Sequence, residues 1–212
     1  MNAVQPGALR SGVLLAGVAV LGSALLASVH MLTEARIEEQ ERRAVLERLH
    51  QVMPDTAYDN ELHEDYVTVT EPDTFRHDGP VTIYRARRNG EPVGAILRVT
   101  APDGYNGDIE MLVGVYMNGN ISGVRITRHR ETPGLGDPIE RRRSPWILAF
   151  DGRSLSDPPR AGWAVKRDGG IFDQFTGATI TPRAVVEAVE RSLLYFEYEK
   201  ARLFEQGATT TP

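Results

Sequence analysis

The 212-residue sequence contains no cysteine. This absence excludes structural disulfides, cysteine-ligated zinc, iron–sulfur clusters and c-type haem attachment. The histidines are few and scattered, and none forms an i, i+3 or i, i+4 pair that would hold a metal: His30, His50, His63, His77 and His129. The sequence therefore predicts no metal site, and any redox chemistry would need an organic cofactor.

A basic surface is also missing. The formal net charge is −5, and the run Arg141–Arg143 is the one tight cluster of positive charge. Because phosphate-backbone binding needs a basic face, we expect no nucleic-acid partner.

The segment of residues 11–32 has no charged residue. Its length is that of a helix that spans a bilayer, about 20 residues. A secretory signal peptide would have a shorter apolar core and a small-residue cleavage site. Since the chain after Thr33 continues directly into a helical pattern, we favour an uncleaved transmembrane anchor, with the lipid bilayer as a partner.

The charges that flank this segment give the orientation. Arg10 precedes it, which by the positive-inside rule leaves residues 1–10 in the cytoplasm and the rest of the chain outside. Arg36, Arg42 and Arg43 on the other side oppose this orientation, but glutamates are interleaved with them.

Residues 33–54 form an amphipathic pattern that ends at a proline. Ile37, Val45, Leu49 and Val52 recur at near-helical spacing, and Pro54 follows. We predict a helical stalk, with a coiled-coil interface as the alternative.

Residues 55–200 form the predicted main domain, and residues 201–212 its C-terminal tail. From Tyr66 onward, short alternating apolar stretches are separated by turn pairs such as Asn89–Gly90, which is a hairpin signal. A final helix is predicted from Pro182, with Val185 and Val189 on its apolar side. The predicted fold class is α+β: a single N-terminal transmembrane helix, then a mainly antiparallel sheet with flanking helices.

The stretch "DQFTGATITP", Asp173 to Pro182, is rich in small residues and threonine. Thr181 has the chemistry of an N-cap and Pro182 that of a first helical residue, so Thr179 would lie just ahead of a helix N-terminus. Unpaired N–H groups and the helix dipole favour an anion there, above all a phosphate. The alternative is an ordinary capped helix start.

The same stretch resembles a known attachment motif. "DQFTGAT" is similar to the Asp-x-x-(Ser/Thr)-Gly-Ala-Thr flavinylation motif of FMN-binding domains in bacterial membrane redox complexes, and it matches at Asp173, Thr176, Gly177, Ala178 and Thr179. In that family a flavin transferase attaches FMN to the last threonine through a phosphoester bond. The resemblance implies Thr179 as the acceptor and covalent FMN as the cofactor.

Two further blocks resemble the same family in the same order. "GYNGDIEMLVGV", Gly104 to Val115, is similar to its Gly-Tyr-x-Gly-x-Ile stretch, and "HRETPGLGDPIE", His129 to Glu140, to its Glu-Thr-Pro-Gly-Leu-Gly segment. With the N-terminal anchor, the pattern resembles the G subunits of Rnf-type (Rsx-type) electron-transport complexes. The C subunit of the sodium-pumping NADH:quinone reductase shares the motif and the anchor but is usually longer.

The resemblance implies roles for the second block beside the flavin ring. Gly134 and Gly136 would permit close backbone approach, Leu135 would offer apolar contact, and Glu131 and Thr132 would hydrogen-bond the ring edge. The alternative is a plain type II Pro-Gly turn in which Gly134 supplies the positive φ.

Three other residues are left with open roles. His129 is expected to hydrogen-bond within its loop. Asp173 would either guide the transferase or cap a turn, and Tyr105 would stack on a ring or pack on the core.

By resemblance, the chain relays electrons in a bacterial inner-membrane complex that couples ferredoxin/NAD electron transfer to ion translocation. Its main domain would be periplasmic, its partners would be the other subunits and, during maturation, the flavin transferase, and no residue is assigned a catalytic role. The alternatives are a membrane-anchored sensor or adaptor, the C-type subunit, and a freestanding flavin reductase. The reductase would need a nicotinamide site, and Gly134–Gly136 lacks the strand-to-helix context of a dinucleotide fingerprint.

Overall fold

The computed structural model describes residues 15–23, 25–28, 40 and 43–205 of the chain, which divides into two compact units at residue 45. In the first unit, residues 15–23 and 25–28 are helical. No helix within the described residues is both long and apolar enough to cross a membrane. Part of the predicted transmembrane segment 11–32, the cytoplasmic residues 1–10 and the end of the tail lie outside the described residues.

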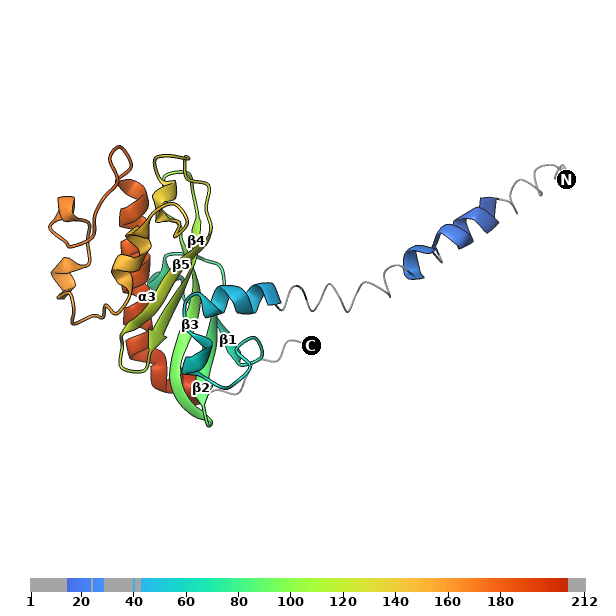
Figure 1. Cartoon of the computed structure of the whole chain (residues 1–212), viewed down its shortest axis with the longest axis horizontal. Helices are drawn as coiled ribbons and strands as arrows, with labels where there is room; N and C mark the ends of the chain where they lie inside the picture. Colours follow the sequence, from blue (N-terminus) through green and yellow to red (C-terminus); the bar gives the residue numbers. More distant parts are fainter. Residues whose placement is uncertain (1–14, 24, 29–39, 41–42, 206–212) are drawn as a thin grey trace, which may run out of the picture. The chain divides into compact units, whose positions relative to one another are not determined.

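The second unit is built on one antiparallel sheet whose strands follow one another in sequence order (Figure 1). The strands are β1 (Tyr66–Val69), β2 (Val81–Arg88), β3 (Glu91–Ala101), β4 (Ile109–Tyr116) and β5 (Ile121–Arg128). The predicted Asn89–Gly90 hairpin is confirmed, because both residues have the positive φ, 53° and 84°, of the turn that matches strand twist.

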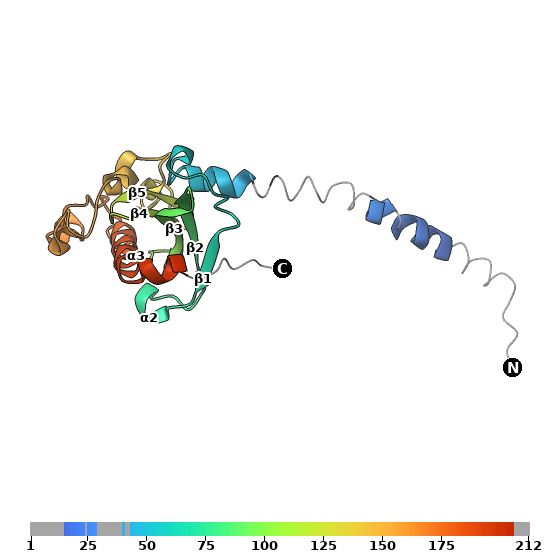
Figure 2. The ribbon, with the colours of Figure 1, turned by 90° about the horizontal axis from the view of Figure 1, so that it is seen from below.

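Residues 46–50 at the start of this unit are helical, and two labelled helices follow. The short α2 (Pro72–Phe75) precedes β2, and the long α3 (Ile180–Glu205) covers one face of the sheet (Figure 2). Val185, Val189 and Phe196 of α3 are fully buried in the main core with strand residues such as Val113 and Val115. The predicted α+β class and the apolar side of the last helix are thus confirmed.

Helix α3 extends past residue 200, where the predicted main domain ends. Leu203 is fully buried, and its carbonyl accepts a hydrogen bond of 2.9 Å from the buried Arg85. Arg87 donates at 3.1 Å to the carbonyl of Phe204. These two guanidinium groups satisfy carbonyls that the helix end leaves without intrahelical partners.

The other face of the sheet carries the end of the predicted stalk. Val52 and Met53 are buried, and a side chain at any of three strand glycines would collide with them. A Cβ on Gly114 would lie 2.6 Å from Val52 Cγ1, one on Gly123 2.8 Å from the Val52 carbonyl oxygen, and one on Gly94 3.0 Å from Met53 Cε. The globular unit therefore begins at Leu46 rather than at the predicted boundary of 55.

Between β5 and α3 the chain runs through 3-10 turns: η2 (Asp137–Ile139), η3 (Pro145–Phe150), η4 (Arg160–Gly162) and η5 (Lys166–Asp168). A further 3-10 turn, η1 (Asp55–Ala57), precedes the sheet. Aromatic rings hold the long connection together, since Phe150 stacks on Phe172 with ring centroids 4.5 Å apart and Trp146 meets Phe175 edge to face at 5.2 Å. This packing holds the part of the connection that leads into α3, which carries one of the motifs singled out in the sequence.

Candidate cofactor site

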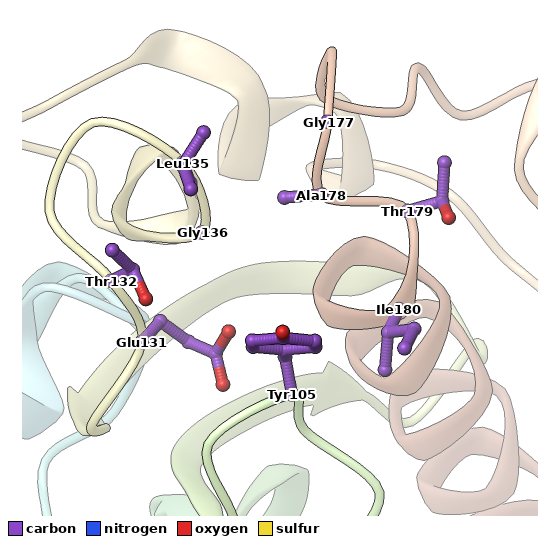
Figure 3. Close-up of a pocket in the computed structure, with 9 residues that line it drawn as sticks. All are labelled: Tyr105, Glu131, Thr132, Leu135, Gly136, Gly177, Ala178, Thr179 and Ile180. Carbon is purple, nitrogen blue, oxygen red and sulfur yellow. The ribbon is translucent and has the colours of Figure 1, made fainter.

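Three segments that are distant in sequence enclose a pocket of about 160 Å³ (Figure 3). They are the loop between β3 and β4, the turn after β5, and the residues that lead into α3. The lining residues are Tyr105, Glu131, Thr132, Leu135, Gly136, Gly177, Ala178, Thr179 and Ile180. All three sequence blocks that resemble the FMN-binding family thus contribute to one pocket.

The turn after β5 has the geometry expected of a Pro-Gly turn. The N–H of Leu135 donates to the carbonyl of Thr132 at 3.1 Å, and Gly134 supplies the positive φ of 80°. The N–H of Gly134 also donates to Asp137 Oδ1 at 2.6 Å. The turn leaves the Leu135 side chain 45% exposed at the pocket, facing Ala178 (Figure 3).

The threonine loop forms a second tight turn. The N–H of Ala178 donates to the carbonyl of Phe175 at 3.1 Å, and Gly177 has a φ of 82°. A Cβ on Gly177 would lie 3.7 Å from Leu135 Cδ2, so the two turns approach each other closely. Gly134 and Gly177 therefore both serve the turn geometry, a role that the sequence predicts for the first of them only.

Helix α3 begins at Ile180, two residues earlier than the predicted start at Pro182, which changes the roles of its first residues. Thr179, not Thr181, precedes the first helical residue, and its carbonyl accepts from the N–H of Arg183 at 3.4 Å. Pro182 accordingly lies within the first turn, where a missing N–H has no cost. The prediction of Thr181 as the N-cap was wrong, because its side chain is fully buried and hydrogen-bonded elsewhere.

Two donors at the start of α3 are left available. Within the described part of the chain, the N–H groups of Ile180 and Thr181 donate to no acceptor, and the hydroxyl of Thr179 has no hydrogen bond. The positive end of the helix dipole lies at the same place. The local environment of Thr179 therefore suits an anionic group.

Asp173 and Thr176, the first two matched residues of the motif, are not part of the pocket lining. The Asp173 carboxylate is exposed and pairs with Lys166 Nζ at 2.6 Å, and the Asp173 carbonyl accepts from Trp146 Nε1 at 2.7 Å. The structure therefore brings Gly177, Ala178 and Thr179 to the pocket and leaves Asp173 on the surface beside it.

Glu131 is buried at the pocket, with 5% of its surface exposed. Its Oε1 accepts from the N–H of Asn106 at 3.0 Å, and its Oε2 accepts from the hydroxyl of Thr181 at 2.5 Å. The partners Asn106 and Thr181 were missed at the sequence level, as was Ile180. A threonine placed directly before a proline at a helix start signals a cap, so nothing local indicates a bond to residue 131.

Thr132 and His129 hydrogen-bond within the same region. Thr132 Oγ1 accepts from Asn106 Nδ2 at 3.0 Å. His129 Nδ1 accepts from the N–H of Glu131 at 3.0 Å, and its Nε2 lies 2.7 Å from Glu140 Oε1. His129 is therefore the loop hydrogen-bonding residue that the sequence predicts.

Two carboxylates near the site are held ionised by arginines. Hydrogen bonding from Arg142, with a smaller contribution from His129, lowers the pKa of Glu140 from 4.5 to about 2. The bidentate contact from Arg183 in the first turn of α3 lowers the pKa of Asp168. Among the described residues, no group of three or more His, Cys, Asp or Glu side chains is arranged to hold a metal.

Comparison with known proteins identifies the family. Residues 104–194 match the FMN-binding domain family, and residues 1–52 match the family described as the RnfG N-terminal region. The chain is 50% identical to the G subunit of the ion-translocating oxidoreductase complex of Pseudomonas aeruginosa over 82% of each chain. It belongs to the RnfG family. Proteins of the same name from Pectobacterium atrosepticum and Shewanella loihica are 49% and 45% identical, over 80% and 85% of each chain.

The FMN-binding domain match contains every residue that lines the pocket. The G-subunit relatives and the match to the RnfG N-terminal region confirm the resemblance that the motifs indicate, rather than the alternative of a C-type subunit. A crystal structure of NqrC from Shewanella oneidensis is 24% identical, with a TM-score of 0.47, and the match covers 72% of this chain and 74% of that one.

Proposed function

We propose that this RnfG protein holds FMN in the pocket between the two glycine turns and carries it on Thr179 through a phosphoester bond. The observation that supports the attachment most directly is the position of Thr179, whose free hydroxyl precedes a 26-residue helix with two unpaired N–H groups. The bridging oxygen would be Thr179 Oγ. The remaining phosphate charge would then be stabilised by those N–H groups and by the helix dipole.

The size of the pocket limits how much of the cofactor it encloses. Pockets that bury most of the surface of a drug-sized ligand commonly measure about 300–1,000 Å³, and this pocket measures about 160 Å³. Three of the exposed large apolar side chains of the domain surround it: Tyr105, Leu135 and Ile180. We infer that part of the flavin rests on these side chains at the surface, where a redox partner can reach it.

The residues of the pocket fit a carrier better than an enzyme with its own substrate. When bound, FMN supplies the redox chemistry by taking up and releasing electrons. Thr132, Leu135 and Gly136 would position the ring, and Thr179 would tether the phosphate. A covalent tether keeps the cofactor at high local concentration without tight noncovalent binding. The chain would therefore relay electrons between other subunits of the complex.

We further propose the cellular setting that the sequence indicates. Residues 11–32 would cross the bacterial inner membrane, with residues 1–10 in the cytoplasm and the FMN-binding domain in the periplasm. A flavin transferase would load the domain there. Exposed Asp173, beside the acceptor loop but outside the pocket, is available to contact that transferase.

The test is the intact mass and peptide map of the full chain co-expressed with a flavin transferase. We expect one added FMN on the peptide that contains Thr179, and none in Thr179→Val. Thr68→Val is the matched control, because Thr68 is an exposed residue of β1 outside both the motif and the pocket. An unmodified wild-type chain beside a modified control substrate would contradict the covalent attachment to Thr179.

A further inference from the structure

The geometry points to Glu131 as a positioning residue of the flavin site, which fixes the first turn of α3 through Thr181 and places an uncompensated negative charge beside the flavin. This inference rests on the proposed function. In this role Glu131 is not a hydrogen-bond partner of the flavin ring edge. It acts by holding Thr181 in place and by the electrostatic effect of its charge on the flavin.

The position of Glu131 joins the three segments of the site. Its two carboxylate oxygens accept from Asn106, in the loop between β3 and β4, and from Thr181, in the first turn of α3. Its own N–H donates to His129 Nδ1. One buried side chain thus determines how the loop, the turn after β5 and the helix start lie relative to one another.

Two motif glycines leave the space that this carboxylate occupies. A Cβ on Gly136 would lie 2.6 Å from Glu131 Oε2 and 3.0 Å from Thr181 Oγ1. A Cβ on Gly104 would lie 3.0 Å from Glu131 Oε1. Gly136 was expected to permit close approach of the flavin, and the structure gives it this additional reason to be glycine.

The bond to Thr181 fixes the attachment site. Thr181 lies two residues after Thr179 in the turn whose N–H groups would receive the phosphate. With the hydroxyl of Thr181 fully buried against Glu131, that turn has one orientation relative to the pocket. Correct presentation of Thr179 to the transferase and of the phosphate to the helix therefore depends on Glu131.

The charge of Glu131 has a second effect. Both oxygens act as acceptors, as in an ionised carboxylate, and no Lys, Arg or His side chain of the described residues forms an ion pair with it. Two-electron reduction, FMN + 2 e⁻ + H⁺ → FMNH⁻, adds one negative charge to the ring. A fixed negative charge in the pocket wall opposes this change, so Glu131 would keep the midpoint potential low.

The experiment uses the full chain, loaded by co-expression with the transferase, and two variants that separate the two effects. Glu131→Gln keeps the shape and can keep both hydrogen bonds, with the amide oxygen accepting from the N–H of Asn106 and the amide nitrogen donating to the hydroxyl oxygen of Thr181, but it removes the charge. Thr181→Val keeps the charge and removes the hydrogen bond. Glu110→Gln is the control, because Glu110 pairs with Arg98 and Arg128 on β3 and β5, away from the pocket.

We expect Glu131→Gln to load FMN and to raise the equilibrium constant for flavin reduction about tenfold, a potential about 30 mV more positive. We expect Thr181→Val to load FMN severalfold more slowly and, once loaded, to keep the wild-type potential. The control should match the wild type in both measurements. A merely structural role would not shift the potential of a folded, loaded Glu131→Gln chain.

Two results would overturn the inference: a wild-type potential in loaded Glu131→Gln, or wild-type loading in Thr181→Val. Near-UV circular dichroism separates a misfolded variant from a folded one, and Thr181→Val tests the inference if the glutamine variant misfolds. An unloaded wild-type chain would refute the proposed function itself, and this inference with it.

Discussion

Glu140 shows how one residue near the site links stability to pH. Its carboxylate accepts hydrogen bonds from Arg142 and from His129, and its pKa in the folded chain is about 2 rather than 4.5. A lowered folded-state pKa contributes stability above the unfolded-state pKa, and that stability is lost as the pH falls through the folded-state value. The contribution of Glu140 to stability is therefore lost as the pH falls from about 4.5 to about 2.

We predict that Glu140→Gln lowers the free energy of unfolding by about 1 kcal/mol at pH 7, a modest value because Arg142 is 75% exposed and the pair is screened by solvent. The difference from the wild type should shrink between pH 4.5 and pH 2. Urea unfolding at pH 7, 4 and 2.5 measures it. An equal difference at all three values would show that the ionised carboxylate is not responsible.

Asp65 is the residue on which the anchoring of the α3 C-terminus depends. It pairs with Arg85, which is 1% exposed, and with Arg87, and these two arginines donate to the last carbonyls of α3. Removing one partner of a buried ion pair leaves the other charge desolvated and without compensation.

We predict that Asp65→Ala lowers the free energy of unfolding by about 3 kcal/mol. The double variant Asp65→Ala with Arg85→Met should lose less than the sum of the two single variants, because it removes the stranded charge. Chemical denaturation of the wild type, the two single variants and the double variant gives the coupling free energy between residues 65 and 85. Strict additivity would mean that the pair does not act as a unit.

At the scale of elements, the contact of residues 46–53 with the sheet depends on three glycines in neighbouring strands. Gly114 and Gly123 are paired across β4 and β5, and Val52 lies against both. At Gly123 the colliding atom would be a backbone oxygen, which cannot rotate away.

We predict that Gly123→Ala lowers the free energy of unfolding by about 1–3 kcal/mol through overpacking. The matched control is Gly17→Ala, where an added Cβ has no neighbour within 4 Å and the helix is not part of the globular unit. Thermal unfolding compares the two. Equal stability of both variants would contradict the close contact between Val52 and β5.

The elements that the sequence predicts well are those set by local pattern. Alternating apolar residues and the Asn89–Gly90 pair give the hairpins, and the spacing of Val185, Val189 and Phe196 gives α3. The contact of Val52 with the strand glycines is not local. A glycine within a strand pattern indicates only a weak or closely approached strand, and it does not say which segment approaches.

In the candidate site, too, the features set by local sequence were predictable and the contacts between distant segments were not. Each of its three segments is recognisable from its own motif, and the Thr132–Leu135 turn follows from its Pro-Gly pair. The bond between Glu131 and Thr181 joins residues 50 positions apart. Thr181 has the residue type of an N-cap, so local preference points to the wrong role, and tertiary packing decides the outcome.

For the whole molecule, the division at residue 45 separates a globular unit from the residues proposed to anchor it. The globular unit includes Leu49, Val52 and Met53, all buried. Each buried apolar side chain of this kind stabilises the fold by about 1.5–3 kcal/mol.

We predict that a chain beginning at Leu46 keeps the unfolding temperature of the domain and stays in the supernatant after membranes are pelleted. A chain beginning at Asp55 should melt at a clearly lower temperature, because it lacks those three side chains. The full chain should sediment with the membranes. Recovery of the full chain in the supernatant would contradict the proposed anchor, whereas equal melting of the two shorter chains would contradict the boundary at Leu46.

The bond between Glu131 and Thr181 also closes a loop that spans 50 residues and contains no long helix or strand. Closing such a loop carries an entropic cost that packing within it, including the contacts among Trp146, Phe150 and Phe172, must outweigh. The surface that presents Thr179 would then form only once this loop has packed. Attachment of FMN would then be limited to chains whose domain has folded, and covalently bound flavin would identify those chains.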